Sequence, residues 1–287
     1  MQAPRIRALA SIGASAVLAA AGLVATTSPA EAAEWAPADS ATIHPGVQMY
    51  TEGAQCTANF VYTDGAGNAY VGYAAHCAGT GAATDTNGCD ADSLPLGTKV
   101  DFVEGGSLAG EGTRVGGGTL AYSSWLSMQQ AGTTDENACA YNDLALVKVD
   151  AADLGKVNPS LPFWGGPVGI NTEGAPAGDR VYSFGNSSLR GGIEELSPKT
   201  GTSVGTTGEG WSHPVYTLTP GVPGDSGSAF LDAEGNALGT LSTLAIAPLA
   251  GSNGVGDLSR ELSFAQANSG ISGLALEPGT EPFSPVL

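Results

Sequence analysis

Basic residues are scarce in this sequence, and charge of either sign is sparse. Its 287 residues hold 10 lysines and arginines against 28 aspartates and glutamates, which gives a formal net charge of −18 at pH 7. Because phosphate binding needs lysine and arginine, such a chain will not bind nucleic acid through its net field. We interpret the acidity as solubility outside a cell rather than as recognition of a basic partner.

Motifs for metals and cofactors are also missing. The sequence has no Cys-x-x-Cys pair, only three histidines and no phosphate-binding glycine loop after a strand pattern. We therefore expect no cofactor and no metal, with a calcium site at Asp85, Asp90 and Asp92 as the alternative. His44 and His213 are expected to be structural or to face solvent.

A long apolar stretch occurs at the N-terminus and nowhere later. Arg5 and Arg7 precede an apolar run over residues 8–24, and Ala30-Glu31-Ala32 offers small residues where signal peptidase reads. A membrane-anchoring helix is disfavoured because the run is short and broken by glycine and serine. We expect residues 1–32 to be a signal peptide, the protein to be secreted into the extracellular space, and no membrane association after cleavage.

Four cysteines follow that segment, namely Cys56, Cys77, Cys89 and Cys139. An even number in an exported chain indicates two disulfides, and sequence alone allows three connectivities.

Short apolar runs separated by turn residues indicate an all-β protein. The 43 glycines and 17 prolines are scattered along the chain rather than gathered in one linker. Strands are expected at residues 56–63, 69–73, 99–103, 119–122, 144–149, 180–184, 215–218, 229–232, 237–242 and 262–265. Helical patterns occur at residues 124–131 and 265–274.

Three short motifs contain the residue types of nucleophilic catalysis. Ser226 lies in the tight turn Gly224-Asp225-Ser226-Gly227, His76 follows an expected strand, and Asp143 precedes the apolar run 144–149. A serine hydroxyl is a poor nucleophile unless a base takes its proton, and a carboxylate can orient that base. These residues lie far apart in the chain and would have to meet in space.

At these motifs the chain resembles the chymotrypsin-like (trypsin-fold) serine proteases, bacterial secreted type. Ala75-His76-Cys77, Asp143-Leu144-Ala145-Leu146 and Gly224-Asp225-Ser226-Gly227 match in order and at similar spacing, over roughly residues 45–270. The resemblance implies two six-stranded antiparallel β-barrels packed with the active site between them. It also implies a monomeric serine endopeptidase that hydrolyses protein or peptide substrates through an acyl-enzyme.

The expected domains follow from the resemblance and from breaks in the strand pattern. Glycine, asparagine and proline interrupt the pattern at residues 153–162. We expect an N-terminal arm and first barrel over residues 33–155, a second barrel over 156–276, and a loosely attached C-terminal tail over 277–287.

The resemblance also assigns roles to residues. Ser226 is the nucleophile, His76 the general base and Asp143 its orienting carboxylate, while the N–H groups of Gly224 and Ser226 form the oxyanion hole. Ser242 corresponds to a serine that hydrogen-bonds the aspartate and lines the substrate strand. The resemblance pairs Cys56 with Cys77, which leaves Cys89 with Cys139.

The sequence departs from the family before Cys56, where no Ile-Val-Gly-Gly-like activation site occurs. In the animal branch a new N-terminal ammonium pairs with the aspartate before the nucleophile, here Asp225. We hypothesise that Arg180 or Arg190 replaces that ammonium.

Substrate preference is weakly encoded. Pro220 stands where trypsin-like members have an aspartate, and Leu241 where glutamate-specific relatives have a histidine. Glu261 could approach the specificity pocket from the last strand and favour basic side chains. A small or apolar side chain before the cut is the default expectation.

Two other functions compete with this interpretation. The Gly-x-Ser-x-Gly match at residues 201–205 suggests an α/β-hydrolase. No helix pattern follows it, however, and the only later histidine, His213, is too close to the serine in sequence for that fold. A non-catalytic binding or adhesive protein on the same fold is the alternative from another class, because a fold does not imply activity.

Overall fold

A computed structural model describes Met1 and residues 34–81, 86–244 and 250–286. The chain divides into residues 1–32 and residues 33–287, and every element below belongs to the second unit. Apart from Met1, the expected signal peptide lies outside the described residues. No helix within the described part of the chain is long and apolar enough to cross a membrane.

The first half of this unit and one strand from its C-terminal end form an eight-stranded antiparallel sheet in the order β14-β3-β4-β7-β6-β5-β1-β2. Its strands are β1 (Gln48–Thr51), β2 (Ala54–Thr57), β3 (Val61–Thr63), β4 (Ala69–Ala74), β5 (Lys99–Glu104), β6 (Thr113–Ser123), β7 (Leu144–Val149) and β14 (Ala275–Leu276). The expected first barrel is not confirmed, because β14 and β2 are the ends of this sheet and it does not close.

The second half forms a closed six-stranded barrel in the order β10-β13-β12-β11-β8-β9. Its strands are β8 (Arg180–Phe184), β9 (Pro198–Ser203), β10 (Ser212–Thr217), β11 (Ala229–Leu231), β12 (Ala237–Leu244) and β13 (Asn253–Asp257). The prediction of a mostly β protein with a six-stranded second barrel is therefore confirmed.

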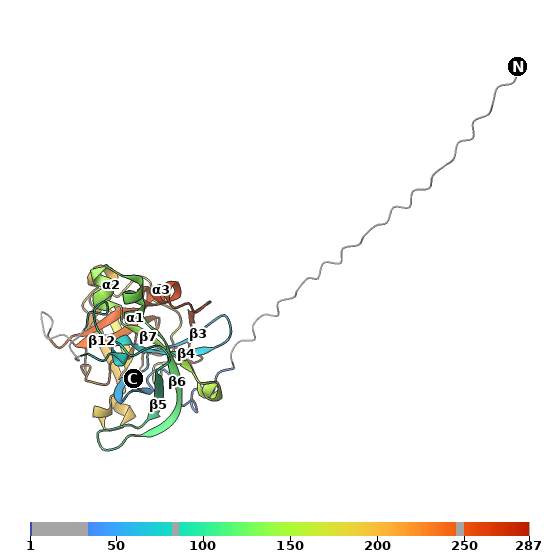
Figure 1. The fold of residues 1–287 in the computed structure, drawn as a ribbon. Helices are drawn as coiled ribbons and strands as arrows, with labels where there is room; N and C mark the ends of the chain where they lie inside the picture. Colours follow the sequence, from blue (N-terminus) through green and yellow to red (C-terminus); the bar gives the residue numbers. More distant parts are fainter. Residues whose placement is uncertain (2–33, 82–85, 245–249, 287) are drawn as a thin grey trace. The chain divides into compact units, whose positions relative to one another are not determined.

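Helices are few and short (Figure 1). They are α1 (Ser124–Ala131), α2 (Glu136–Tyr141) and α3 (Leu258–Asn268), with one-turn or two-turn 3₁₀ helices η1 (Ala75–Ala78), η2 (Ala151–Lys156), η3 (Ser188–Arg190), η4 (Glu194–Leu196) and η5 (Gly208–Gly210). Helix α1 has the expected bounds. The strand expected at residues 262–265 is wrong: Asp257 caps α3 by accepting the Arg260 N–H at 2.9 Å, which starts a helix there.

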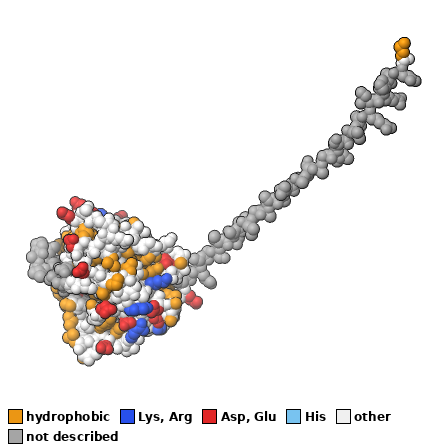
Figure 2. All heavy atoms as spheres, in the orientation of Figure 1, with side chains coloured by type: hydrophobic (Ala, Val, Ile, Leu, Met, Phe, Trp, Pro, Cys, Tyr) orange, Lys and Arg blue, Asp and Glu red, His pale blue; other side chains and the backbone are white. Residues whose placement is uncertain are grey.

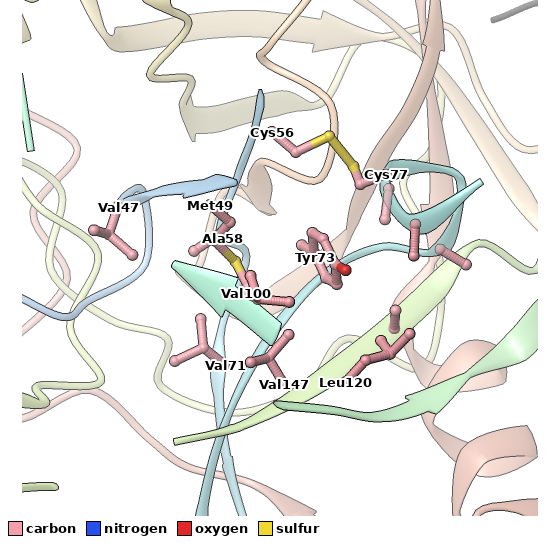
Figure 3. Packing of buried hydrophobic residues seen from close by; sticks show 14 of the residues in the cluster. Val47, Met49, Cys56, Ala58, Val71, Tyr73, Cys77, Val100, Leu120 and Val147 are labelled. Carbon is pink, nitrogen blue, oxygen red and sulfur yellow. A yellow bond between two sulfur atoms is a disulfide. The ribbon is translucent and has the colours of Figure 1, made fainter. Parts of the chain in front are cut away.

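The buried hydrophobic residues form three clusters. One lies within the first sheet and includes Met49, Val71 and Val147 (Figure 3), and another fills the barrel. The remaining cluster contains residues of both, such as Leu144 of β7 and Leu231 of β11. Because burial of apolar area drives docking, this shared cluster fixes the barrel against the first sheet.

The C-terminal tail is attached to the rest of the unit, which corrects the expectation of a loose end. The Glu277 N–H donates to the Val61 carbonyl at 2.9 Å, and the Ser284 N–H donates to the Trp164 carbonyl at 2.7 Å. Phe283 packs edge-on against Tyr182, with ring centroids 5.4 Å apart. Backbone pairing and aromatic packing thus order a proline-rich segment that has no strand pattern of its own.

On the face seen in Figure 2, lysine and arginine side chains gather in one area, beside acidic ones. Among the described residues, Lys99–Asp150 and Arg114–Asp101 are exposed ion pairs and Lys156–Asp153 is a partly exposed one. Ion pairs at this exposure add little to stability. The basic residues outside these pairs therefore tell more about the site than the paired ones do.

Candidate active site

Asp143 is the centre of a buried hydrogen-bond network. One of its carboxylate oxygens accepts from His76 Nδ1 at 2.7 Å and from Ser242 Oγ at 2.6 Å, and the other accepts the His76 backbone N–H at 2.8 Å. The aspartate is 4 % exposed, whereas the imidazole of His76 keeps 27 % of its surface. Asp143 therefore fixes the position, tautomer and orientation of a histidine that solvent can reach.

Strand register explains why these two residues meet. Strands β4 and β7 are antiparallel neighbours, and Ala74 at the end of β4 lies opposite Leu144 at the start of β7. The next residues outward are those of η1, and the Ala75 N–H donates to the Asp143 carbonyl at 2.8 Å. His76 and Asp143 are thus placed at the same edge of the sheet.

Two opposing effects act on the protonation of His76. Burial, the largest effect, lowers the pKa of the imidazole, while the charge of Asp143 and its hydrogen bond raise it. The net result is a pKa of His76 raised above its ordinary value of 6.5. A proton on this imidazole is therefore held more tightly than in water.

Ser226 lies in the loop between β10 and β11, which packs directly against the first sheet. Its carbonyl accepts the Thr57 N–H of β2 at 2.8 Å, and the Gly227 N–H donates to the Leu241 carbonyl at 2.7 Å. Gly227 has a φ of +89°, and a Cβ there would lie 2.9 Å from the Ala74 nitrogen. The glycine thus lets the serine loop approach the end of β4. Helix η1, which contains His76, starts at the next residue.

Two N–H groups of this loop have no acceptor among the described residues. The N–H groups of Val222, Asp225, Gly227 and Ser228 all donate hydrogen bonds within the protein. Those of Gly224 and Ser226 donate to no described residue. Both residues are half-buried, and free backbone N–H groups in such a loop are donors at which an anionic oxygen can bind.

Asp225 is fully buried and pairs with two cations. Its carboxylate contacts Arg190 Nη2 and Lys199 Nζ, both at 2.5 Å, and accepts the Ser187 and Val222 N–H groups. Burial lowers the pKa of Lys199 below its ordinary value of 10.5, although the charge of Asp225 opposes that shift. The ion cluster of Asp225, Arg190 and Lys199 thus anchors the serine loop through the side chain between Gly224 and Ser226.

Of the two arginines hypothesised as partners of Asp225, Arg190 makes the contact. Arg180 is exposed and forms no salt bridge with any described residue. Lys199 of β9 was missed by sequence reasoning, because a lysine beside a proline in a threonine-rich segment carries no recognisable motif. The scarcity of basic residues in the sequence is the signal that could have pointed to this lysine.

The residues expected at the specificity pocket are scattered. Pro220 is exposed, and its carbonyl lies 3.5 Å from Lys199 Nζ. Glu261 belongs to α3 rather than to a last strand, is fully buried, and accepts the Asp143 N–H at 3.0 Å. Burial removes Glu261 from contact with a substrate, so its expected pocket role is corrected to a contact behind Asp143.

Both disulfides are present, as Cys56–Cys77 and Cys89–Cys139. The first lies beside His76 at the edge of the first core cluster (Figure 3). The cluster of metal-ligand residue types found in the described part of the chain is Cys56, His76 and Cys77, whose two sulfurs are bonded to each other. Asp85 of the calcium alternative lies outside the described residues.

His213 makes buried polar contacts inside the barrel. Its Nε2 lies 2.9 Å from an Asp257 oxygen and its Nδ1 3.1 Å from Thr206 Oγ1. The expectation of a structural histidine agrees with this pairing, which ties β10 to the cap of α3. His44 is half-buried, with Nδ1 2.8 Å from the Pro45 carbonyl.

No protein-family model matches the sequence, and a comparison with curated protein sequences finds no match. Solved structures do match. Thermobifida fusca protease A is 18 % identical over 83 % of this chain and 99 % of its own, with a TM-score of 0.48. A glutamic acid specific serine protease is 19 % identical over 82 % of this chain and 100 % of its own, with a TM-score of 0.47. Cellulomonas bogoriensis chymotrypsin is 20 % identical over 82 % and 98 %, with a TM-score of 0.46. The structures to which this chain is similar are thus chymotrypsin-like bacterial serine proteases.

Proposed function

We propose that this chain is a secreted serine endopeptidase of the chymotrypsin-like family, with Ser226, His76 and Asp143 as its catalytic triad. The observation that carries the proposal is the Asp143 network, in which one carboxylate holds both the Nδ1 and the backbone N–H of His76. The close approach of the serine loop to the end of β4, through Gly227, supports Ser226 as the third member. An oriented base beside a glycine-flanked serine is the arrangement that activates a hydroxyl.

The proposed reaction begins at the free nitrogen of His76. Since Nδ1–H donates to Asp143, Nε2 carries the lone pair and accepts the Ser226 hydroxyl proton as Oγ attacks the peptide carbonyl carbon. The substrate oxygen becomes an anion at the free N–H groups of Gly224 and Ser226. The tetrahedral intermediate then collapses as His76 gives its proton to the leaving amine.

The second half of the reaction releases the acid product. Water enters in place of the amine, and His76 takes its proton while the oxygen attacks the acyl-Ser226 ester. The same two N–H groups stabilise the second oxyanion, and the proton returns to Ser226 Oγ as the ester bond breaks. The Asp143 carboxylate stabilises the imidazolium that forms in each half.

Substrate binding is proposed at Ser242 and near Pro220. Ser242 lies on β12, a strand that brings its hydroxyl to Asp143 and leaves the serine half-buried beside the triad. Pro220 offers no charge to a basic side chain, so we propose cleavage after small or apolar residues. Protein or peptide substrates, a monomeric enzyme and extracellular action complete the proposal, with the two disulfides in its favour.

Fluorophosphonate labelling of the secreted protein tests the proposal. We expect one adduct, mapped by peptide mass spectrometry to Ser226, which is absent from Ser226→Ala and from His76→Ala. Ser203→Ala is the matched control. Ser203 is the serine of the Gly-x-Ser-x-Gly match and is buried, with its hydroxyl donated to the Ala175 carbonyl at 2.7 Å.

Turnover of a peptide library by the wild type and by Ser203→Ala, with none by Ser226→Ala, would complete the support. A folded wild-type protein that neither reacts with the probe nor cleaves peptides would contradict the proposal. Such a result would favour the non-catalytic binding protein. An adduct on another serine would also overturn the assigned nucleophile.

A further inference from the structure

Hydroxyl groups from outside the serine loop hold the carbonyls on both sides of Gly224. Ser187 Oγ donates to the Pro223 carbonyl at 2.5 Å, and Thr57 Oγ1 donates to the Gly224 carbonyl at 2.7 Å. Gln55 Nε2 donates to the same Gly224 carbonyl at 3.0 Å. Two consecutive peptide groups are therefore fixed by side chains of distant segments.

The orientation of the first peptide decides where the Gly224 N–H points. In the described residues the cis peptide bond is Gly166–Pro167, so the Pro223–Gly224 bond is trans. A trans peptide directs its carbonyl and its N–H to opposite sides. With the carbonyl fixed toward Ser187, the N–H is directed away from Ser187, and no described residue accepts it there.

Each hydroxyl has its proton directed by a second hydrogen bond. Ser187 Oγ accepts the Leu189 N–H at 3.1 Å, and Thr57 Oγ1 accepts the Asn186 N–H at 3.1 Å. An oxygen that accepts from an amide on one side donates its single proton on the other. Both Ser187 and Thr57 are fully buried, so water does not compete for these bonds.

Gly224 itself offers little resistance to a change of peptide orientation. Its φ is +94°, a conformation that glycine reaches as readily as the alternatives. Rotation of the Pro223–Gly224 peptide would turn the N–H inward and leave the anion site with the Ser226 N–H alone. The active orientation therefore needs an external restraint.

We propose that Ser187 and Thr57 are positioning residues of the oxyanion hole, which hold the peptides flanking Gly224 so that its N–H faces the substrate. The inference rests on the proposed function, since it concerns the transition state of that reaction. Neither residue touches the substrate. Each acts through the Gly224 peptide groups, Ser187 from the second half of the unit and Thr57 from the first.

Steady-state kinetics of Ser187→Ala, Thr57→Val and Thr57→Ser with a peptide amide substrate tests this inference. Loss of one such hydrogen bond is expected to lower kcat about tenfold. KM should stay within about twofold, because the oxyanion exists in the transition state and not in the bound substrate. Thr57→Ser keeps the hydroxyl and is expected to retain wild-type kcat. Thr57→Val keeps the shape but lacks the hydroxyl, so its kcat should show the tenfold fall.

The matched control is Ser197→Ala. Ser197 is fully buried, its carbonyl accepts the Gly185 N–H at 3.0 Å, and its hydroxyl has no hydrogen-bond partner among the described residues. This variant is expected to keep wild-type kcat. A peptide trifluoromethyl ketone adds the distinguishing measurement, because its adduct carries an oxyanion. Its inhibition constant should rise in Ser187→Ala and Thr57→Val by the same factor by which kcat/KM falls.

The outcomes separate this inference from the function on which it rests. A wild type that cleaves peptides, together with unchanged kcat in Ser187→Ala and Thr57→Val, overturns the positioning role and leaves the peptidase standing. Equal losses in Thr57→Ser or Ser197→Ala also overturn it. A wild type without turnover overturns the proposed function and this inference together. Should Ser187→Ala fail to fold, the Thr57→Val and Thr57→Ser pair decides the question.

Discussion

At the scale of single residues, the protonation of His76 sets the working pH of the proposed enzyme. Burial lowers the pKa of His76, but the charge and hydrogen bond of Asp143 raise it more, so it lies above 6.5. A general base must be neutral to accept a proton. We therefore expect kcat/KM to rise with pH through a midpoint above 6.5 and to reach a plateau on the alkaline side.

The Asp143→Asn variant tests the cause of that midpoint. Removal of the charge leaves burial as the main effect on His76, so the midpoint should move to lower pH. An amide at this position also favours the wrong tautomer, and kcat should fall by about 10⁴. A wild-type midpoint at or below 6.5, or an unmoved midpoint in Asp143→Asn, would contradict the assignment.

A second prediction concerns Glu261, the buried acid behind Asp143. Burial, the largest effect, raises the pKa of Glu261 well above its ordinary value of 4.5, and the charge of Asp143 adds to the shift. The folded protein then keeps a proton that the unfolded chain releases above pH 4.5. Stability is therefore lost as pH rises, by about 1.4 kcal/mol per unit until the folded-state pKa is reached.

Glu261→Gln removes this linkage and keeps the acceptor for the Asp143 N–H. We expect the variant to match the wild type in free energy of unfolding at pH 4 and to exceed it at pH 7 to 8. Urea denaturation at both pH values measures the difference. If the difference in free energy of unfolding between variant and wild type is the same at both pH values, Glu261 is ionised in the folded protein.

The triad candidates could be found from sequence, whereas Glu261, Ser187 and Thr57 could not. Ser226, His76 and Asp143 stand in short motifs whose residue types carry the chemistry themselves. The other three act through backbone groups of distant segments, and any residue of suitable shape and polarity can fill such a position. Their contribution depends on a contact that exists in the folded chain alone.

At the scale of elements, segment 185–190 and strand β9 supply the cations that hold the serine loop. Arg190 is the last residue of η3, Lys199 is the second residue of β9, and both reach Asp225. The side chain of Lys199 is 1 % exposed and that of Arg190 is 11 % exposed. If Lys199 is removed, water can therefore reach the Asp225 carboxylate less easily than if Arg190 is removed.

We expect Lys199→Met to destabilise the protein by about 2 kcal/mol, since it removes a hydrogen bond to a buried charge. Arg190→Met should cost less, because water can reach the vacated position. Both variants should lose turnover, as Asp225 lies between Gly224 and Ser226, whose N–H groups form the proposed oxyanion hole. Arg180→Met, which changes an exposed arginine, is the matched control and should retain wild-type melting temperature and kcat.

The ranking of these variants is the informative result. Thermal unfolding and kcat measured together on the three single variants give it directly. Losses in Arg180→Met as large as those in Lys199→Met would indicate a general effect of lowered positive charge. Equal wild-type behaviour in all three would mean that the loop is held by its backbone hydrogen bonds.

Elements with a clear pattern were predictable, and those without one were not. Strand β7 has the expected bounds because its apolar run is buried on both faces, and α1 ends as expected at a left-handed glycine, Gly132. Strands β9 and β13, rich in glycine, serine or threonine, carry no hydrophobic alternation, and no strand is expected at either place from the sequence. Their pairing comes from neighbours in the barrel, and tertiary contacts override local preference there.

At the scale of the whole unit, the closure of the second barrel was predictable from the family resemblance, but the first half differs from it. Strand β14 comes from the C-terminal part of the chain and pairs with β3, so the first sheet recruits a strand far away in sequence. Such a pairing has a long loop and no local sequence signal. Residues 156–276, expected to be the second barrel, therefore include a strand of the first sheet.

The proposed active site exists where the first sheet and the barrel meet, and Gly227 is the residue that permits the contact. A Cβ at Gly227 would overlap the Thr57 carbonyl oxygen and lie 2.9 Å from the Ala74 nitrogen and 3.2 Å from Tyr73 Cβ. Two of these three are backbone atoms, which cannot move unless β2 or β4 moves. Gly53 offers a matched comparison, with a φ of +87° and nothing within 4 Å of such a Cβ.

Alanine at either glycine carries the same left-handed backbone cost of about 1 kcal/mol. We expect Gly53→Ala to lose about that much stability and to keep wild-type kcat. Gly227→Ala adds the overlap and should separate the serine loop from the strand end that leads to His76. Its kcat should fall by more than about 100-fold, since misplacement of a reacting group by about 1 Å has an effect of that size. If the two variants lose equal stability and both keep turnover, the serine loop does not depend on this close approach, and docking must be set by the shared apolar cluster instead.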